Sequence, residues 1–314
     1  MNTHSNTEPE SSFDSNGIPP AMMSATRPMY WSVRRELWEN RSVYMAPLIV
    51  AVVVLFGTLI SMIGLPRRMR TLSALDPAKQ HTVVVRPHSM APAPIILVTF
   101  LVGIFYSLDA LHGERRDRSI LFWKSLPVSD RTTVLSKASI PLVVLPLIGL
   151  ALGVFTQHIV LLLSTAVLLV NGVSPATLWT EVRFIQEPLV MIYGLTVHVL
   201  WFAPIYGWLL LVSAWARRTP VLWAALPLFA IALVEKIAFN TSYFVHMLKY
   251  RVIGAMVEAF AVESQGAADH AVIDRLAQLD PARFLSTPGL WIGLVFAAAF
   301  LAAAVRLRRD REPI

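Results

Sequence analysis

Six apolar runs, separated by polar and charged segments, dominate the pattern of this 314-residue chain. Each run is long enough to cross the hydrocarbon of a bilayer as a helix, which takes about 20 residues for about 30 Å. The pattern therefore predicts an all-α, polytopic integral membrane protein. Its six expected transmembrane helices are Tyr44–Leu65, Ala93–Leu111, Ile140–Val170, Pro188–Trp215, Val221–Phe239 and Pro288–Val305.

Composition agrees with this assignment, because 55% of the residues are apolar and 15% are charged, outside the usual range of soluble domains. The chain contains no cysteine, which excludes disulfides, thiolate metal sites and cysteine nucleophiles. Residues 1–26 are rich in polar and acidic side chains and lack the basic start and apolar core of a signal peptide. We expect them to form a disordered N-terminal tail.

The net charge of +7 comes from basic residues in the loops and tails of a membrane protein, where they indicate which side each loop lies on. We therefore expect no nucleic-acid partner. Most of the 27 lysines and arginines lie beside helix ends on the side that the N-terminus occupies. The positive-inside rule then places both termini in the cytoplasm, with residues 307–314 as a basic cytoplasmic tail. Arg67, Arg68 and Arg70, on the predicted outer side, oppose this orientation.

Residues 27–43 precede the first span and predict an amphipathic helix at the membrane interface. Apolar side chains recur at helical spacing through Tyr30, Val33 and Leu37, next to charged ones. Tryptophan at headgroup depth and arginine toward anionic lipid suit such a helix. A plain cytosolic lead-in to the first span is the alternative. The candidate interfacial residues are Trp31, Arg34, Arg35, Glu36 and Trp38.

The segment 113–137 between the second and third spans is short, charged and aromatic. Gly113 is expected to end the preceding helix, Ser119–Ser125 to form a short helix that Pro127 ends, and Ser129 to cap the next helix. A rigid helix tied to two spans can transmit a push, whereas the plain alternative is an interfacial loop. By contrast, the outer segment 240–287 predicts an amphipathic helix, followed by a second short helix over Ala271–Leu279.

This segment, Gly-Glu-Arg-Arg-Asp-Arg-Ser-Ile-Leu-Phe-Trp-Lys-Ser-Leu-Pro-Val-Ser-Asp at 113–130, resembles the cytoplasmic loop of ABC type-2 transporter permeases. The stretches Arg35–Ser42 with Pro47, and Phe284–Trp291, also resemble that family. The similarity runs in order from about Met29 to the last span. The Arg67–Arg70 cluster and the sizeable outer segments depart from the pattern and leave the substrate class open.

The resemblance implies the membrane permease subunit of an ATP-binding cassette exporter in a bacterial inner membrane. It implies a dimer with a second copy or a paralogue, and a separate ATP-binding subunit that carries ATP and Mg²⁺ and docks on the loop and on the helix before the first span. The chain has no phosphate-binding loop of its own, so we expect neither enzyme activity nor a cofactor in it. The candidate coupling residues are Glu114, Arg115, Arg116, Ser119, Phe122, Trp123, Leu126 and Pro127.

Ionisable residues inside apolar runs are costly in lipid and are candidates for function. Asp109 is expected to pair with a base such as Arg115 or to reach water, and Glu235 and Lys236 to pair with other helices at a dimer or gate interface. His158 and His198 suggest a second function, a haem-binding electron-transfer subunit, although neither belongs to a ligand-spaced motif. A membrane scaffold without transport is a third possibility.

Overall fold

The helices of this chain follow the apolar runs closely. The structure is a computed structural model that describes residues 26–71, 87–121, 128–182, 185–260 and 276–310. The first half contains α1 (Thr26–Glu39), α2 (Ser42–Ser61), the 3₁₀-helix η1 (Met62–Gly64), α3 (Leu65–Thr71), α5 (Ala93–Arg116), α7 (Asp130–Ser139), the π-helix η3 (Ile140–Val144) and α8 (Leu145–Val170). The second half contains α9 (Ala176–Glu181), α10 (Gln186–Trp215), α11 (Pro220–Phe239), α12 (Tyr243–Ala259), the 3₁₀-helix η4 (Leu276–Gln278), α13 (Pro281–Ser286) and α14 (Pro288–Asp310).

The predicted all-α class with six apolar helices is confirmed. Within the described residues, six helical stretches are long and apolar enough to cross a membrane: Ser42–Thr71, Pro87–Arg116, Asp130–Val170, Gln186–Trp215, Pro220–Phe239 and Pro288–Asp310. No β-strand occurs in the ranges given above, where an isolated antiparallel bridge joins Phe260 to Leu279. We therefore describe the chain as a membrane protein.

The third span is one long helix with a proline defect near its start. Ser129 caps α7 as predicted, because its hydroxyl accepts a hydrogen bond from the Thr132 amide at 3.1 Å. Pro141 has no N–H to donate, and the backbone widens there into the π-helix η3 before it continues as α8. The whole stretch Asp130–Val170 contains 41 residues, which is more than a straight helix needs to cross a bilayer.

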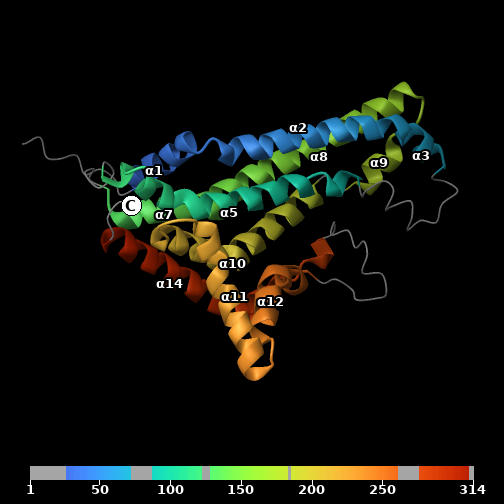
Figure 1. Cartoon of the computed structure of the whole chain (residues 1–314). Helices are drawn as coiled ribbons and strands as arrows, with labels where there is room; N and C mark the ends of the chain where they lie inside the picture. Colours follow the sequence, from blue (N-terminus) through green and yellow to red (C-terminus); the bar gives the residue numbers. More distant parts are fainter. Residues whose placement is uncertain (1–25, 72–86, 122–127, 183–184, 261–275, 311–314) are drawn as a thin grey trace, which may run out of the picture.

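Helix α10 lies at the centre of the bundle, packed against α5 and, along much of its length, against α14 (Figure 1). Gly207 permits the close approach of α14, since a Cβ there would lie 3.2 Å from the carbonyl oxygen of Ala297. Likewise, α8 approaches its neighbours through Gly149, beside Thr99 of α5, and Gly153, beside Met191 of α10. Small residues are the usual means by which membrane helices come into contact.

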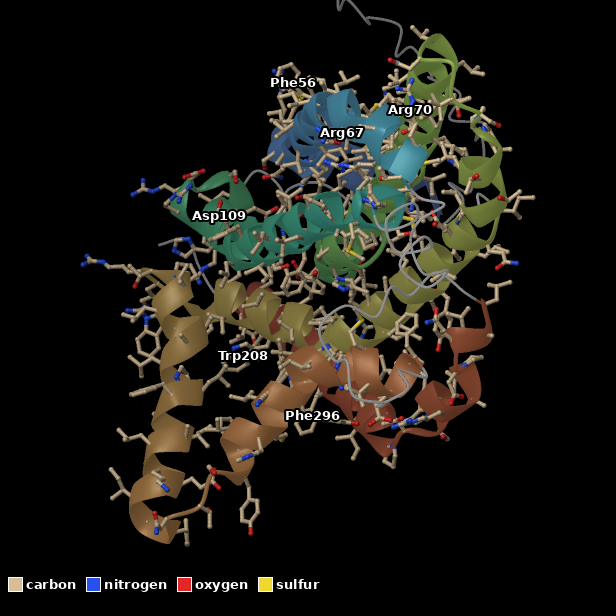
Figure 2. All side chains as sticks on the ribbon, turned by 90° about the vertical axis from the view of Figure 1, so that its right-hand side faces the viewer. Phe56, Arg67, Arg70, Asp109, Trp208 and Phe296 are labelled. Atoms are coloured by element: carbon tan, nitrogen blue, oxygen red, sulfur yellow. The ribbon has the colours of Figure 1, made fainter. Side chains whose placement is uncertain are left out.

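Large apolar side chains cover the outside of this bundle. Figure 2 shows Phe56 and Phe296 directed away from it, with exposed fractions of 66% and 55%. Helix α11 projects from the bundle in Figure 1 with α12 beside it, and Ala224 is its buried residue. Exposed apolar surface on this scale suits contact with lipid and not with water.

The two ends of the bundle differ. Helices α1 and α7 and the C-terminal end of α14 meet at one end, called the termini end here, whereas α3 and α9 lie at the opposite end (Figure 1). Two predicted boundaries are wrong there. Helix α5 does not stop at Gly113 but continues to Arg116, before the chain turns at Arg118 with a φ of 56°. The expected tail 307–314 begins inside α14, because that helix runs to Asp310.

Candidate functional site: a buried ionic cluster

Side chains from four helices form a buried network of charges at the termini end. Three cations and three carboxylates form it, so the formal charges of these six balance, and the half-exposed Glu39 lies 3.6 Å from Arg35 at its edge. We call these six residues the ionic cluster: Arg35 and Glu36 of α1, Glu114 of α5, Asp130 and Lys137 of α7, and Arg308 of α14.

Glu36 and Lys137 form the most deeply buried pair. Their side chains are 0% and 3% exposed, and Lys137 Nζ lies 2.9 and 3.1 Å from the two carboxylate oxygens of Glu36. The Tyr106 hydroxyl donates a further hydrogen bond to Glu36 Oε2 at 2.7 Å. Burial raises the pKa of Glu36, but Lys137, Tyr106 and Arg35 outweigh it, so this pKa lies below its ordinary value. Glu36 is therefore a carboxylate held by its partners.

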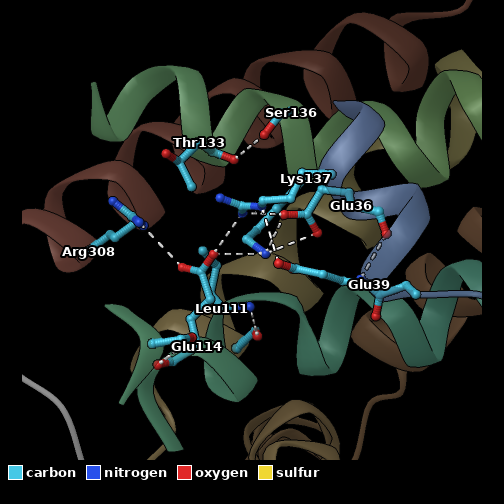
Figure 3. Close-up of polar contacts among 12 residues, drawn as sticks. Glu36, Glu39, Leu111, Glu114, Thr133, Ser136, Lys137 and Arg308 are labelled. Atoms are coloured by element: carbon cyan, nitrogen blue, oxygen red, sulfur yellow. Dashed lines mark hydrogen bonds and ion pairs between the residues drawn. The ribbon is translucent and has the colours of Figure 1, made fainter. Parts of the chain in front are cut away.

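Glu114 joins the remaining members, as Figure 3 shows. Its Oε1 lies 3.2 Å from Arg35 Nη2 and 3.2 Å from Lys137 Nζ, and its Oε2 lies 3.3 Å from Arg308 Nη2. Arg308 also binds Asp130 at the beginning of α7. Glu114 sits in the last turn of α5, where the helix dipole disfavours negative charge, so the three cations supply the stabilisation that the helix end does not.

Local sequence explains why α1 presents these groups inward. Val33 and Leu37 pack against the core near Val43 and Tyr106, and Glu36 lies between them on the same side of the helix. On the opposite side, Trp31 and Trp38 are 55% and 65% exposed. Residues three or four apart share a helix face, which separates a charged inner face from an aromatic outer face.

The outer face carries a stacked arrangement of rings and one cation. The Arg34 guanidinium carbon lies 5.1 Å from the ring centroid of Trp31 and 4.7 Å from that of Trp38. A cation between two aromatic rings suits a surface that contacts headgroups. The five residues predicted as one interfacial set thus divide in two, because Arg35 and Glu36 turn inward.

The predicted coupling residues also occupy different environments. Arg115 is 4% exposed and donates hydrogen bonds to the carbonyl oxygens of Ala214 at 2.8 Å and Ala216 at 3.3 Å, which satisfies the C-terminal end of α10. Arg116 is exposed beside Asp117, and the Ser119 hydroxyl lies 3.4 Å from the Glu114 carbonyl oxygen. The other four, Phe122, Trp123, Leu126 and Pro127, lie outside the described residues.

The predicted polar residues of the apolar runs have local partners. Asp109 does not pair with Arg115; its side chain is 60% exposed and lies 3.7 Å from Arg116. Glu235 accepts hydrogen bonds from the amides of Tyr243 at 2.6 Å and Phe244 at 2.9 Å, so it caps the beginning of α12 within its own chain. Lys236 is exposed.

The two predicted haem ligands do not come together. His158 is exposed, its ring nitrogen lies 2.8 Å from the Val154 carbonyl oxygen of its own helix, and it lines a small pocket beside His88. His198 lines a separate cleft, stacked on Phe202 with ring centroids 4.7 Å apart. Among the described residues, no group of three or more metal-binding side chains is present. The haem alternative stays a prediction.

Sequence reasoning missed Lys137, Tyr106 and Arg308 as parts of one site. Lys137 comes just before the third apolar run and Arg308 follows the last one, so each fits a simple basic anchor. The available signal was that each charge lies within a turn or two of an apolar stretch, where burial demands a counter-ion.

Comparison of the chain with protein families, with curated proteins and with solved structures found no match.

Proposed function

We propose that this chain is the membrane-spanning subunit of an ATP-binding cassette exporter in a bacterial inner membrane, with both termini cytoplasmic. A separate subunit would bind ATP and Mg²⁺, and a second permease copy or paralogue would complete the path. The resemblance of residues 113–130 to the loop of ABC type-2 permeases motivates this proposal. Six candidate spans and the meeting of α1, α7 and the end of α14 at one end of the bundle are consistent with it.

One observation carries the proposal furthest. Glu114, in the last turn of α5 where that helix leads into the loop, is buried and contacts cations from α1, α7 and α14. A displacement of the loop cannot leave those three elements behind without separating buried charges, which is costly in a low dielectric. The ionic cluster would therefore pass movement of the loop, received at the end of α5, to the other helices, while Arg115 fixes the end of α5 to α10 through its two carbonyl partners.

The interfacial part of the proposal concerns α1. Its aromatic outer face, with Arg34 between Trp31 and Trp38, would lie at the headgroups, while its inner face holds the cluster. An amphipathic helix in this position would anchor the termini end to the bilayer surface. Movement of the loop would then act against a fixed point.

The test uses Glu114→Gln in the assembled transporter, with Asp117→Asn as the matched control because Asp117 is 62% exposed. We expect Glu114→Gln to keep the ATP-binding subunit bound while transport per ATP hydrolysed falls several-fold, and Asp117→Asn to behave as the wild type. Unchanged coupling in Glu114→Gln, with normal assembly, would refute the role of the ionic cluster.

A further inference from the structure

A cleft of about 320 Å³ lies in the middle of the bundle, between α5, η3, α8, α10 and α12. Its size falls in the range of small-molecule sites, about 300–1,000 Å³. Gly194 on α10 helps to form it, because a Cβ there would meet its nearest neighbour, Phe260 Cζ, only at 3.8 Å. A larger side chain at this position would occupy part of the cleft.

The lining of this cleft indicates an uncharged ligand. Among the described residues that line it, none is Lys, Arg, Asp or Glu, and most are aliphatic or aromatic. The Thr99 hydroxyl donates to the Ile96 carbonyl oxygen of its own helix at 2.7 Å. A charged group in this cleft would lose its hydration without gaining a counter-ion, which disfavours a charged ligand.

One polar pair interrupts the apolar wall. His198 Nε2 lies 3.3 Å from the Tyr206 hydroxyl, and the ring is held by stacking on Phe202 and by edge contact with Phe100. Within the part of the chain that the structure describes, the His198 ring makes no other hydrogen bond. Its second nitrogen can therefore pair with a hydroxyl or carbonyl group of a ligand, as donor or acceptor according to the tautomer.

The mouth of the cleft faces apolar surroundings. Ile96 on α5 and Val252 and Met256 on α12 line it and are 44%, 57% and 58% exposed. Because these exposed side chains are apolar, the opening between them favours a lipophilic ligand over a hydrated one.

We propose that this cleft binds an uncharged lipophilic molecule from the bilayer, with an apolar chain in the cleft and one hydroxyl or carbonyl group on His198. The site lies within a single chain, so it does not depend on the proposed transport function or on any dimer path. It assigns His198 to ligand binding in place of haem.

The test uses purified protein in nanodiscs and a diazirine-bearing monoacylglycerol, an uncharged single-chain lipid with hydroxyl groups. Labelled peptides are mapped by mass spectrometry, and unlabelled monoacylglycerol serves as competitor. Two comparison probes carry the same chain: a fatty acid, which is anionic, and a hydrocarbon without a headgroup. We expect saturable labelling of α8, α10 and α12 at the cleft, strongest with the monoacylglycerol.

Gly194→Leu fills the cleft with an isobutyl group, and Gly57→Leu on α2, where nothing lies within 4 Å of the added Cβ, is the matched control. Gly194→Leu should weaken labelling about tenfold or more, as pocket filling does, while Gly57→Leu leaves it unchanged. Ile96→Trp narrows the mouth of the cleft and should also weaken labelling, so it provides an independent test if Gly194→Leu folds poorly.

His198→Phe keeps the ring stack and removes the hydrogen bond. It should therefore weaken labelling by the monoacylglycerol several-fold and leave labelling by the hydrocarbon probe unchanged. Labelling that persists in both cleft variants, or that spreads evenly over lipid-facing helices, would overturn the site. Equal or better labelling by the anionic probe would overturn the assignment of an uncharged ligand.

Discussion

Replacement of Lys137 by methionine should destabilise the protein more than any other loss of a single lysine in the described helices. The change keeps the length of the side chain but leaves Glu36 and Glu114 without the ammonium that lies 2.9 and 3.2 Å from them. Removal of one partner from a buried pair costs about 3–5 kcal/mol. Arg35 remains 2.7 Å from Glu36 and 3.2 Å from Glu114, which favours the lower end of that range.

The assay is thermal unfolding of the detergent-solubilised protein, with Lys236→Met as control because Lys236 is exposed. We expect Lys137→Met to lower the midpoint by several degrees and the control to stay near the wild type. The double variant Glu36→Gln with Lys137→Met restores charge balance and should recover part of the loss. Equal midpoints for the two lysine variants, or purely additive effects in the double variant, would refute the reasoning.

Three further results are expected. Gly207→Leu should separate α10 from α14 and lower stability by about 1–3 kcal/mol, as overpacking does, because its Cβ would already lie 3.2 Å from the Ala297 carbonyl oxygen; thermal unfolding measures this. The pKa of Glu36 is lowered in the folded chain, so its contribution to stability is complete above its ordinary pKa of 4.5 and declines as the pH falls below that value. A series of unfolding midpoints measured at decreasing pH should show this loss of stability, and Glu36→Gln should abolish the part of the loss that Glu36 causes. Glu235→Gln weakens the cap of α12 and should speed hydrogen exchange at the Phe244 amide, whereas unchanged exchange would exclude the capping role.

Much of the fold could be predicted because hydropathy reports directly on burial in lipid. The expected spans Val221–Phe239 and Pro288–Val305 match the beginnings of α11 and α14 within one residue. The end of α14 was predicted too early, since basic residues after an apolar run fit a solvated anchor as well as a continued helix. Hydropathy cannot distinguish these, because Arg308 is buried by partners that lie 178 and 194 residues away in the chain.

The candidate site could be predicted only in part for the same reason. Glu114 and Arg115 were recognised from the loop, but their burial depends on α1, α7 and α10, which no local pattern specifies. Glu235 illustrates the opposite error: it resembled an intramembrane charge in need of a distant partner, and instead it caps a helix that begins eight residues later. Short-range hydrogen bonds to backbone satisfy such a carboxylate without any second charge.

The most direct measurement of the central claim is affinity purification of the tagged full-length chain from its native membrane under mild detergent, followed by mass spectrometry and an ATPase assay. The proposed function predicts a co-purifying subunit with an ATP-binding cassette, present in amounts comparable to the chain, and ATP hydrolysis that is lost when the nucleotide-site lysine of that subunit is replaced. An intact chain that reproducibly purifies without any ATP-binding subunit and without ATPase activity would contradict it.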